Sequence, residues 1–304
     1  MHIPNGYLTD PVCAVSTLAA TAALGASIAR VRQLDPSRSA ALMAATGAGI
    51  FAAQMVNFPI DHGTSGHVLG AALAAIVLGP WCGMLTMAVV LTAQCVLFGD
   101  GGISSLGANV LNMAVVATLA ASGIYTLATR SIAGAKGQLL GAGTAALGSV
   151  LAAAAMCSLE LAASGTYATG EVLSAMLRVH TTIGLGEALA TASLVGAALA
   201  IRAEGRAFST RGLMIGSLAV AIAVAGLLAP IASNAPDGLE RVAQDLNFAN
   251  LGSDSLGLIA TDYALPGIGL PELAVALAGI AGVLIVFVTA YTVGRTATVK
   301  VRKR

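Results

Sequence analysis

The sequence predicts an all-α membrane protein, a polytopic helical bundle of about nine transmembrane helices. Three observations predict this class: hydrophobic residues make up 57% of the 304, charged residues only 10%, and the mean hydropathy is +0.87. A soluble domain carries about 25% charged residues, so this composition is typical of a chain that lies mostly in lipid. The net charge of +1 and the dispersed basic residues argue against a nucleic-acid-binding protein.

Long apolar runs mark the expected crossings, because about 20 residues are needed to span the hydrocarbon layer. The run at 66–98 exceeds one crossing and is interrupted at Gly79-Pro80, so we expect two helices there, the first of them short. The other seven runs lie at roughly 11–29, 40–57, 108–129, 137–159, 181–201, 212–232 and 272–293.

Basic residues give the expected orientation. Four basic clusters fall on one side of the membrane only if the 66–98 run crosses twice, and the positive-inside rule makes that side the cytoplasm. The N-terminus is then expected outside and the C-terminus in the cytoplasm, with outside loops near 58–65, 99–107, 160–180 and 233–271. The clusters are Arg30, Arg32 and Arg38; Arg130 and Lys136; Arg202, Arg206 and Arg211; and Arg295, Lys300, Arg302, Lys303 and Arg304.

The chain is expected to divide near residue 206. Residues 1–205 hold seven expected crossings with short connections, and residues 206–304 hold two helices around one long, mildly acidic outside segment. Proline and glycine punctuate that segment at SNAPDGLE and ALPGIG, as in an ordered loop. Four cysteines lie in apolar stretches without CxxC spacing, so we interpret them as buried side chains: Cys13, Cys82, Cys95 and Cys157.

The pair Met1-His2 is the first candidate metal site. A terminal amine, the amide nitrogen of residue 2 and its imidazole can close on one divalent ion, and such nitrogen sets suit Ni(II) and Cu(II). We expect Met1 to be retained, because His2 is bulky and the opening MHIPNGYLTD lacks the features of a cleavable signal peptide. The alternative is that His2 is an arbitrary second residue.

His67 is the second candidate ligand. It ends a glycine-rich outside loop, NFPIDHGTSGH, on the face where the terminal amine is expected. Two imidazoles, an amine and an amide would supply four nitrogens around one ion at the outer mouth. The alternative is that His67 only satisfies polar groups at a helix start. His62 is expected to be a loop residue or part of the path by which the metal enters, and a ligand role for it stays open.

Polar residues near the outer helix ends complete the expected site. Asn57, Asn109 and Asn112 are expected to hold the loops and the ligand imidazoles by hydrogen bonds, as outer-shell partners of metal ligands do. His180 is expected to precede the seventh helix and to cap it or support the site. Glu187, about two turns into that helix, is expected either to have a function or to join helices.

Several motifs resemble the CbiM/NikM family, the substrate-binding membrane components of energy-coupling-factor importers for cobalt and nickel. Within residues 1–200 these are MHIPNGYL, AAQMVNFP, GTSGHVLGAALAAIVLGPW and LFGDGGISSLGANVLNMAVV; the later SNAPDGLERVAQDLNF and DYALPGIG are similar to the PDGLE (NikN-like) module. The resemblance implies that the Met1 amine, the His2 amide and ring, and His67 hold the ion. Residue 5, usually Asp in the family, is Asn5 here, which leaves the ligand set intact but removes a charge beside it.

The resemblance further implies a capture subunit of an ATP-powered importer in the bacterial cytoplasmic membrane. Its implied partners are a membrane coupling subunit and ATP-binding cassette subunits, and Ni²⁺ or Co²⁺ is the transported ligand rather than a prosthetic group. The chain has no GxxxxGK[ST] phosphate loop, so we expect no ATPase site and no enzyme activity. Two alternatives stay open: a self-sufficient secondary divalent-metal transporter, or a non-transport membrane module. A planar nitrogen set favours nickel, but does not exclude cobalt.

Overall fold

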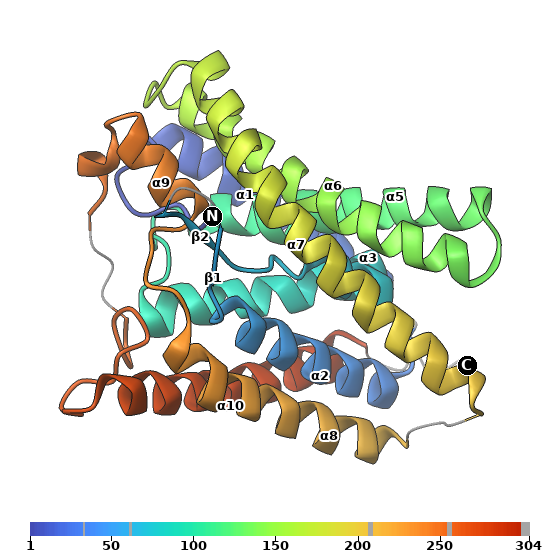
Figure 1. Ribbon diagram of the computed structural model, residues 1–304. Coiled ribbons are helices and arrows are strands. Elements are labelled where there is room, and N and C mark those ends of the chain that lie inside the picture. Colours follow the sequence, from blue (N-terminus) through green and yellow to red (C-terminus); the bar gives the residue numbers. More distant parts are fainter. Residues whose placement is uncertain (33, 61–62, 206–208, 254–256, 299–304) are drawn as a thin grey trace.

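The computed structural model describes residues 1–32, 34–60, 63–205, 209–253 and 257–298, which form a helical bundle (Figure 1). Its longer helices are α1 (Asp10–Val31), α2 (Pro36–Gln54), α3 (Ala71–Ala93), α5 (Ala117–Ser131), α6 (Gly134–Ala163), α7 (Thr169–Ala203), α8 (Thr210–Ala223) and α10 (Pro271–Ala297). The shorter elements are α4 (Leu106–Asn109), α9 (Gly238–Asp245) and an antiparallel pair, β1 (Phe58–Pro59) and β2 (Ser65–Gly66). π-helical turns cover Gln94–Phe98, Val110–Val116 and Val224–Leu228, and 3₁₀ turns cover Ala229–Ile231 and Ala249–Leu251.

Seven helices within these ranges are long and apolar enough to cross a membrane. Each coincides with a predicted apolar run: Asp10–Val31, Ala71–Phe98, Leu106–Ser131, Gly134–Ala163, Thr169–Ala203, Thr210–Ile231 and Pro271–Ala297. Helix α2 matches the predicted crossing at 40–57 but is not among the seven, since it is rich in Ala, Gly and Ser and contains Arg38. The helical membrane class is therefore confirmed, while the count of nine crossings stays a prediction.

The apolar run at 66–98 turns back on itself at Gly79-Pro80, where the sequence predicts a break. Gly79 has φ 74° and ψ 168°, a conformation that favours glycine and is not helical. An ideal Cβ on Gly83 would lie 3.3 Å from the carbonyl oxygen of Ala74. In an uninterrupted helix these two residues would be about 13 Å apart along the axis. The run therefore consists of a short segment and a long one packed against each other.

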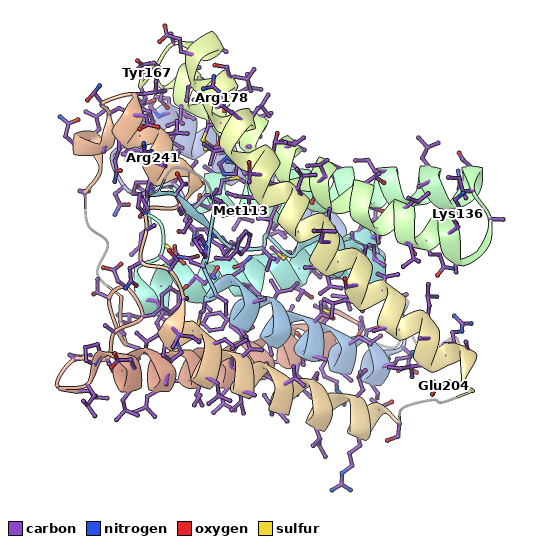
Figure 2. The ribbon with its side chains drawn as sticks, in the orientation of Figure 1. Met113, Lys136, Tyr167, Arg178, Glu204 and Arg241 are labelled. Atoms are coloured by element: carbon purple, nitrogen blue, oxygen red, sulfur yellow. The ribbon has the colours of Figure 1, made fainter. Side chains whose placement is uncertain are left out.

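Basic residues of the predicted clusters lie at one end of the bundle, whereas Arg178 and Arg241 lie at the other, near Tyr167 (Figure 2). Arg295 near the end of α10 donates to the Ser37 hydroxyl at the start of α2 (3.1 Å), and Figure 2 shows Lys136 and Glu204 at the opposite end from Tyr167. Other members of the predicted clusters lie near the last turns of helices or the first turns of the next ones: Arg30, Arg38, Arg130, Arg202 and Arg211. Arg206 and the basic residues beyond 298 lie outside the described residues, and the membrane side of this end stays a prediction.

The predicted outside loop at 160–180 is wrong. Only residues 164–168 join α6 to α7, so His180 lies inside a helix of 35 residues, about 52 Å long. Glu171 and Arg178 lower the hydropathy of the first turns without interrupting the helix, whose buried face carries Val172, Met176 and His180. His180 therefore caps no helix, and Glu187 lies near the middle of α7 rather than near its start.

Helix α10 packs closely on α2 through small residues. An ideal Cβ on Gly282 would lie 2.2 Å from Cζ of Phe51, and one on Gly294 would lie 2.6 Å from Cα of Ala40. Helices inside lipid associate through such small residues, because little hydrophobic driving force is left between them. The last helix is thus part of the same packed bundle as α2.

The segment between α8 and α10 is also fixed to the rest of the chain. The backbone amides of residues 258, 259, 260 and 262 donate to the carbonyls of 96–98, and the ring of Tyr263 stacks on Phe98 with 4.7 Å between centroids. Ser253 pairs with Asn5 in an isolated bridge, which brings this segment to the N-terminal residues. The described parts of this segment therefore cover one end of the bundle.

Replacing Gly282 with Leu should force α10 away from α2, because the new side chain overlaps the Phe51 ring. We expect a loss of about 1–3 kcal/mol of unfolding free energy, the usual cost of overpacking. Gly216→Leu on α8 is the matched control, since no described atom lies within 4 Å of a Cβ there. Thermal unfolding in detergent measures both, and equal melting temperatures would contradict the prediction.

Candidate metal centre

The first residues of the chain are buried beneath α9. Met1 is 6% exposed and Ile3 is fully buried, and Figure 1 shows the N-terminus beside β2 and α9. The Asn109 side chain binds Ile3 twice: Oδ1 accepts from the Ile3 amide (2.8 Å) and Nδ2 donates to its carbonyl (3.1 Å). Asn109 therefore fixes the residue after His2.

The terminal ammonium forms an ion pair with Asp237, the N-cap residue of α9. Asp237 is itself fixed, because Oδ1 accepts from the amides of Leu239 (2.9 Å) and Glu240 (3.0 Å) in a capping box. Burial alone would lower the pKa of the amine, but the Asp237 carboxylate outweighs it and the pKa is raised. Burial likewise acts to raise the pKa of Asp237, and the ammonium reverses this and lowers it. From the sequence, Asp237 is only one of several acidic loop residues.

Asp100 holds the ring of His2. Its carboxylate contacts His2 Nδ1 and accepts a hydrogen bond from the Tyr263 hydroxyl (2.7 Å). Burial raises the pKa of Asp100, but the neighbouring His2 outweighs it and lowers the pKa to about 2. His2 Nε2 is buried without a hydrogen-bond partner among the residues described. Sequence reasoning places Asp100 in an outside turn and misses this contact.

His67 lies against His2. The two rings stack with 5.6 Å between centroids and 28° between planes. Nδ1 of His67 donates to the carbonyl of Val68 (3.0 Å), so its Nε2 carries the lone pair. Burial, followed by the charge of the terminal ammonium, lowers the pKa of His67 to about 4. His67 is therefore neutral at neutral pH, the form that a metal ligand requires.

Three parts of the fold hold the segment that carries His67. Glu187 of α7 accepts hydrogen bonds from the amides of residues 69 and 70 (2.6 and 2.9 Å). Gln54 at the end of α2 donates to the carbonyl of residue 69 (2.7 Å). Ser65 donates its amide to the carbonyl of Pro236 (2.8 Å), immediately before Asp237. Glu187 thus does more than join helices, because it fixes the backbone just after His67.

The other predicted residues are distributed differently. Asn112, in the turn at 110–116, donates to Glu160 of α6 (2.6 Å), and Glu160 also accepts from Ser16 of α1 (2.6 Å). Within the described ranges Asn112 thus binds a helix carboxylate and no ligand imidazole, contrary to expectation. The side-chain oxygen of Asn57 is buried and has no partner within the described ranges. His62 lies outside the described residues. Among the predicted asparagines, Asn109 is the one that binds the N-terminal segment, at the backbone of Ile3.

Two cavities adjoin the three candidate ligands. One, of about 10 Å³, has Met1, His67, His180 and Asp237 in its lining. The other, of about 320 Å³, is polar and reaches His2 between four acidic residues: Asp100, Asp237, Glu240 and Asp262. Among the described residues no group of three or more His, Cys, Asp or Glu side chains could hold a metal ion. A metal site with nitrogen ligands here therefore requires backbone nitrogens in addition to the two imidazoles.

The chain matches two known protein families, one after the other along the sequence. The CbiM family model, described as a cobalt uptake substrate-specific transmembrane region, matches residues 2–205, and the PDGLE domain matches 211–298. The chain is similar to the putative fused nickel transport protein NikMN of Archaeoglobus fulgidus, 53% identical over 116 residues (38% of this chain, 38% of that protein). It is 41% identical to the fused nickel transport protein NikMN of Rhodobacter capsulatus over 164 residues (53% and 46%). The cobalt transport protein CbiM of Acetohalobium arabaticum is 33% identical over 130 residues (42% and 52%).

The three matches cover between 38% and 52% of those relatives' length. A crystal structure described as a truncated transition metal transporter superposes with a TM-score of 0.57 at 34% identity, covering 66% of this chain and 98% of that one. Because the family model spans most of the sequence, the chain belongs to the CbiM family of transmembrane metal-transport proteins, and it carries a PDGLE domain after the CbiM region.

Proposed function

We propose that this chain captures nickel or cobalt ions at the outer face of the bacterial cytoplasmic membrane, as the substrate subunit of an ATP-powered importer. Relatives named as nickel and cobalt transport proteins support the choice of metal. The chain has no phosphate-binding loop, so ATP-binding cassette subunits and a membrane coupling subunit supply the energy. In this proposal the end of the bundle that holds the N-terminus faces outward.

The meeting of Met1, His2 and His67 carries this proposal. The His2 and His67 rings stack at 5.6 Å, and Met1 and His67 line the same small cavity. The proposed ligands are the Met1 amine, the amide and ring of His2, and Nε2 of His67, a nitrogen set that suits Ni(II) better than Mg(II) or Ca(II). Binding through these atoms releases the protons of the ammonium and the amide.

Two carboxylates balance the charge of such an ion. Coordination takes one proton from the ammonium, whose remaining N–H groups still face Asp237, and replaces the contact of the His2 ring with Asp100. Both carboxylates then stay beside the positive charge. The acidic cavity at His2 concentrates negative potential, which draws cations toward the ligands. We assign this cavity as the path by which the ion enters.

Replacing His67 with Ala should reduce nickel binding below detection, because it removes one of four donors. Isothermal titration calorimetry of purified protein measures the affinity, and the melting temperature of the variant checks that the bundle still folds. Undiminished affinity in a folded His67→Ala variant would remove His67 from the ligand set.

Extending the chain by a few residues ahead of Met1 should abolish nickel binding and uptake, since the amine then becomes an amide nitrogen. The same extension at the C-terminus is the control and should leave both unchanged. Uptake of radioactive nickel by cells carrying the importer subunits provides the measurement. Full uptake with the N-terminal extension would show that the amine is not a ligand.

Replacing Glu187 with Gln should weaken nickel affinity by about 10- to 100-fold, as loss of an outer-shell partner does. The glutamine oxygen still accepts from one of the two backbone amides, but its NH2 group donates and faces the other, which also donates. The His67 segment therefore loses one of the two bonds that fix it. Glu160→Gln is the matched control, because Glu160 is also a buried carboxylate but contacts Ser16 and Asn112 instead. Equal affinities for the two variants would contradict the positioning role of Glu187.

A further inference from the structure

His180 is a buried histidine with one ring nitrogen left without a partner. Its side chain is 1% exposed, and Nδ1 donates to the carbonyl of Met176 one turn earlier in α7 (2.8 Å). This bond places the lone pair on Nε2. Nε2 has no hydrogen-bond partner among the described residues. A buried acceptor of this kind requires an explanation, because such groups are normally satisfied.

His180 lines the small cavity beside the proposed ligands. The cavity measures about 10 Å³, about the space that one water molecule needs. Met1, His67 and Asp237 line it together with His180. The polar partners of a water molecule there would come from these four residues, since the rest of the lining includes the apolar Leu69, Val150 and Ile183.

Gly238 of the PDGLE domain leaves room for this arrangement. An ideal Cβ on Gly238 would lie 2.8 Å from Cε1 and 2.9 Å from Nε2 of His180, and 3.0 Å from Cδ1 of Ile183. Any side chain at this position would therefore displace the imidazole or fill the space before it. Asp237, the preceding residue, pairs with the terminal amine, so one turn of chain contacts both the amine and His180.

The chemistry of a metal-bound amine supplies the missing partner. An amine that donates its lone pair to a metal keeps two N–H groups, and in a buried site each requires an acceptor. The Asp237 carboxylate already lies against this nitrogen and serves as one acceptor. A second acceptor is needed on another side, and Nε2 of His180 is a buried acceptor that borders the same cavity.

We propose that His180 is a positioning residue of the metal site, whose Nε2 accepts a hydrogen bond from the metal-bound Met1 amine through one water molecule in this cavity. The inference rests on the proposed function, since it takes Met1 as a ligand. His180 and Asp237 then orient the amine from two directions, so that its lone pair points to the ion. His180 itself does not bind the metal.

His180→Leu tests this role, because leucine fills similar volume and accepts no hydrogen bond. We expect Ni(II) affinity to fall about 10- to 100-fold and the visible ligand-field bands of the Ni(II) complex to shift, with little change in melting temperature before metal is added. His180→Gln, which restores an acceptor, should recover most of the affinity and the wild-type bands. A purely structural histidine would change the melting temperature and leave the bands in place.

Gly238→Ala provides a second test that keeps the histidine. It tests the inference even if His180→Leu does not fold. Its methyl group occupies the space in front of Nε2, so we expect the same loss of affinity. Wild-type affinity and bands in His180→Leu, or in Gly238→Ala, would overturn the inference. If the wild-type protein binds neither Ni(II) nor Co(II), the proposed function fails instead, so the two failures are distinguishable.

Discussion

The ion pair between the Met1 ammonium and Asp237 is the interaction on which the arrangement of the site depends. It joins the first residue of the chain to the start of α9, 236 positions later. Both groups are largely buried, where an unpaired charge would be strongly unfavourable, so neither partner can leave without replacement. A divalent ion bound by the amine is such a replacement, because it returns positive charge to the same carboxylate. The pairing thus keeps the N-terminus in place. When the ammonium loses its charge to bind an ion, the ion's positive charge replaces it beside Asp237.

The PDGLE sequence itself can be understood from these contacts. Pro236 offers its carbonyl to Ser65, two residues before His67. Asp237 pairs with the amine, Gly238 leaves space for His180, Leu239 is buried, and Glu240 completes the capping box. One turn therefore contacts three separate parts of the candidate centre. Residues 236–240 therefore form a wall of the candidate site, in addition to the packing of α10 on α2.

Helix α7 contributes two buried polar groups to the same region. His180 borders the small cavity, and Glu187, seven positions later, holds the backbone that follows His67. Residues seven apart lie on one face of a helix. Polar groups inside a membrane protein are costly unless they are paired, and they usually mark functional positions. Helix α7 therefore fixes both groups relative to each other beside the candidate centre.

Composition and apolar run length were enough to predict the helical membrane class, and Gly79-Pro80 was enough to predict the break in α3. The sequence also predicted that Met1, His2 and His67 belong at one mouth, because charge distribution alone assigns loops to sides. It did not reveal Asp100 and Asp237 as partners of His2 and Met1, nor the true start of α7 and the role of Asn112. Hydropathy measures how favourably each residue transfers into lipid, which is a property of single residues and does not depend on distant contacts. Pairings between residues 98 or 236 positions apart are decided only when distant segments pack together.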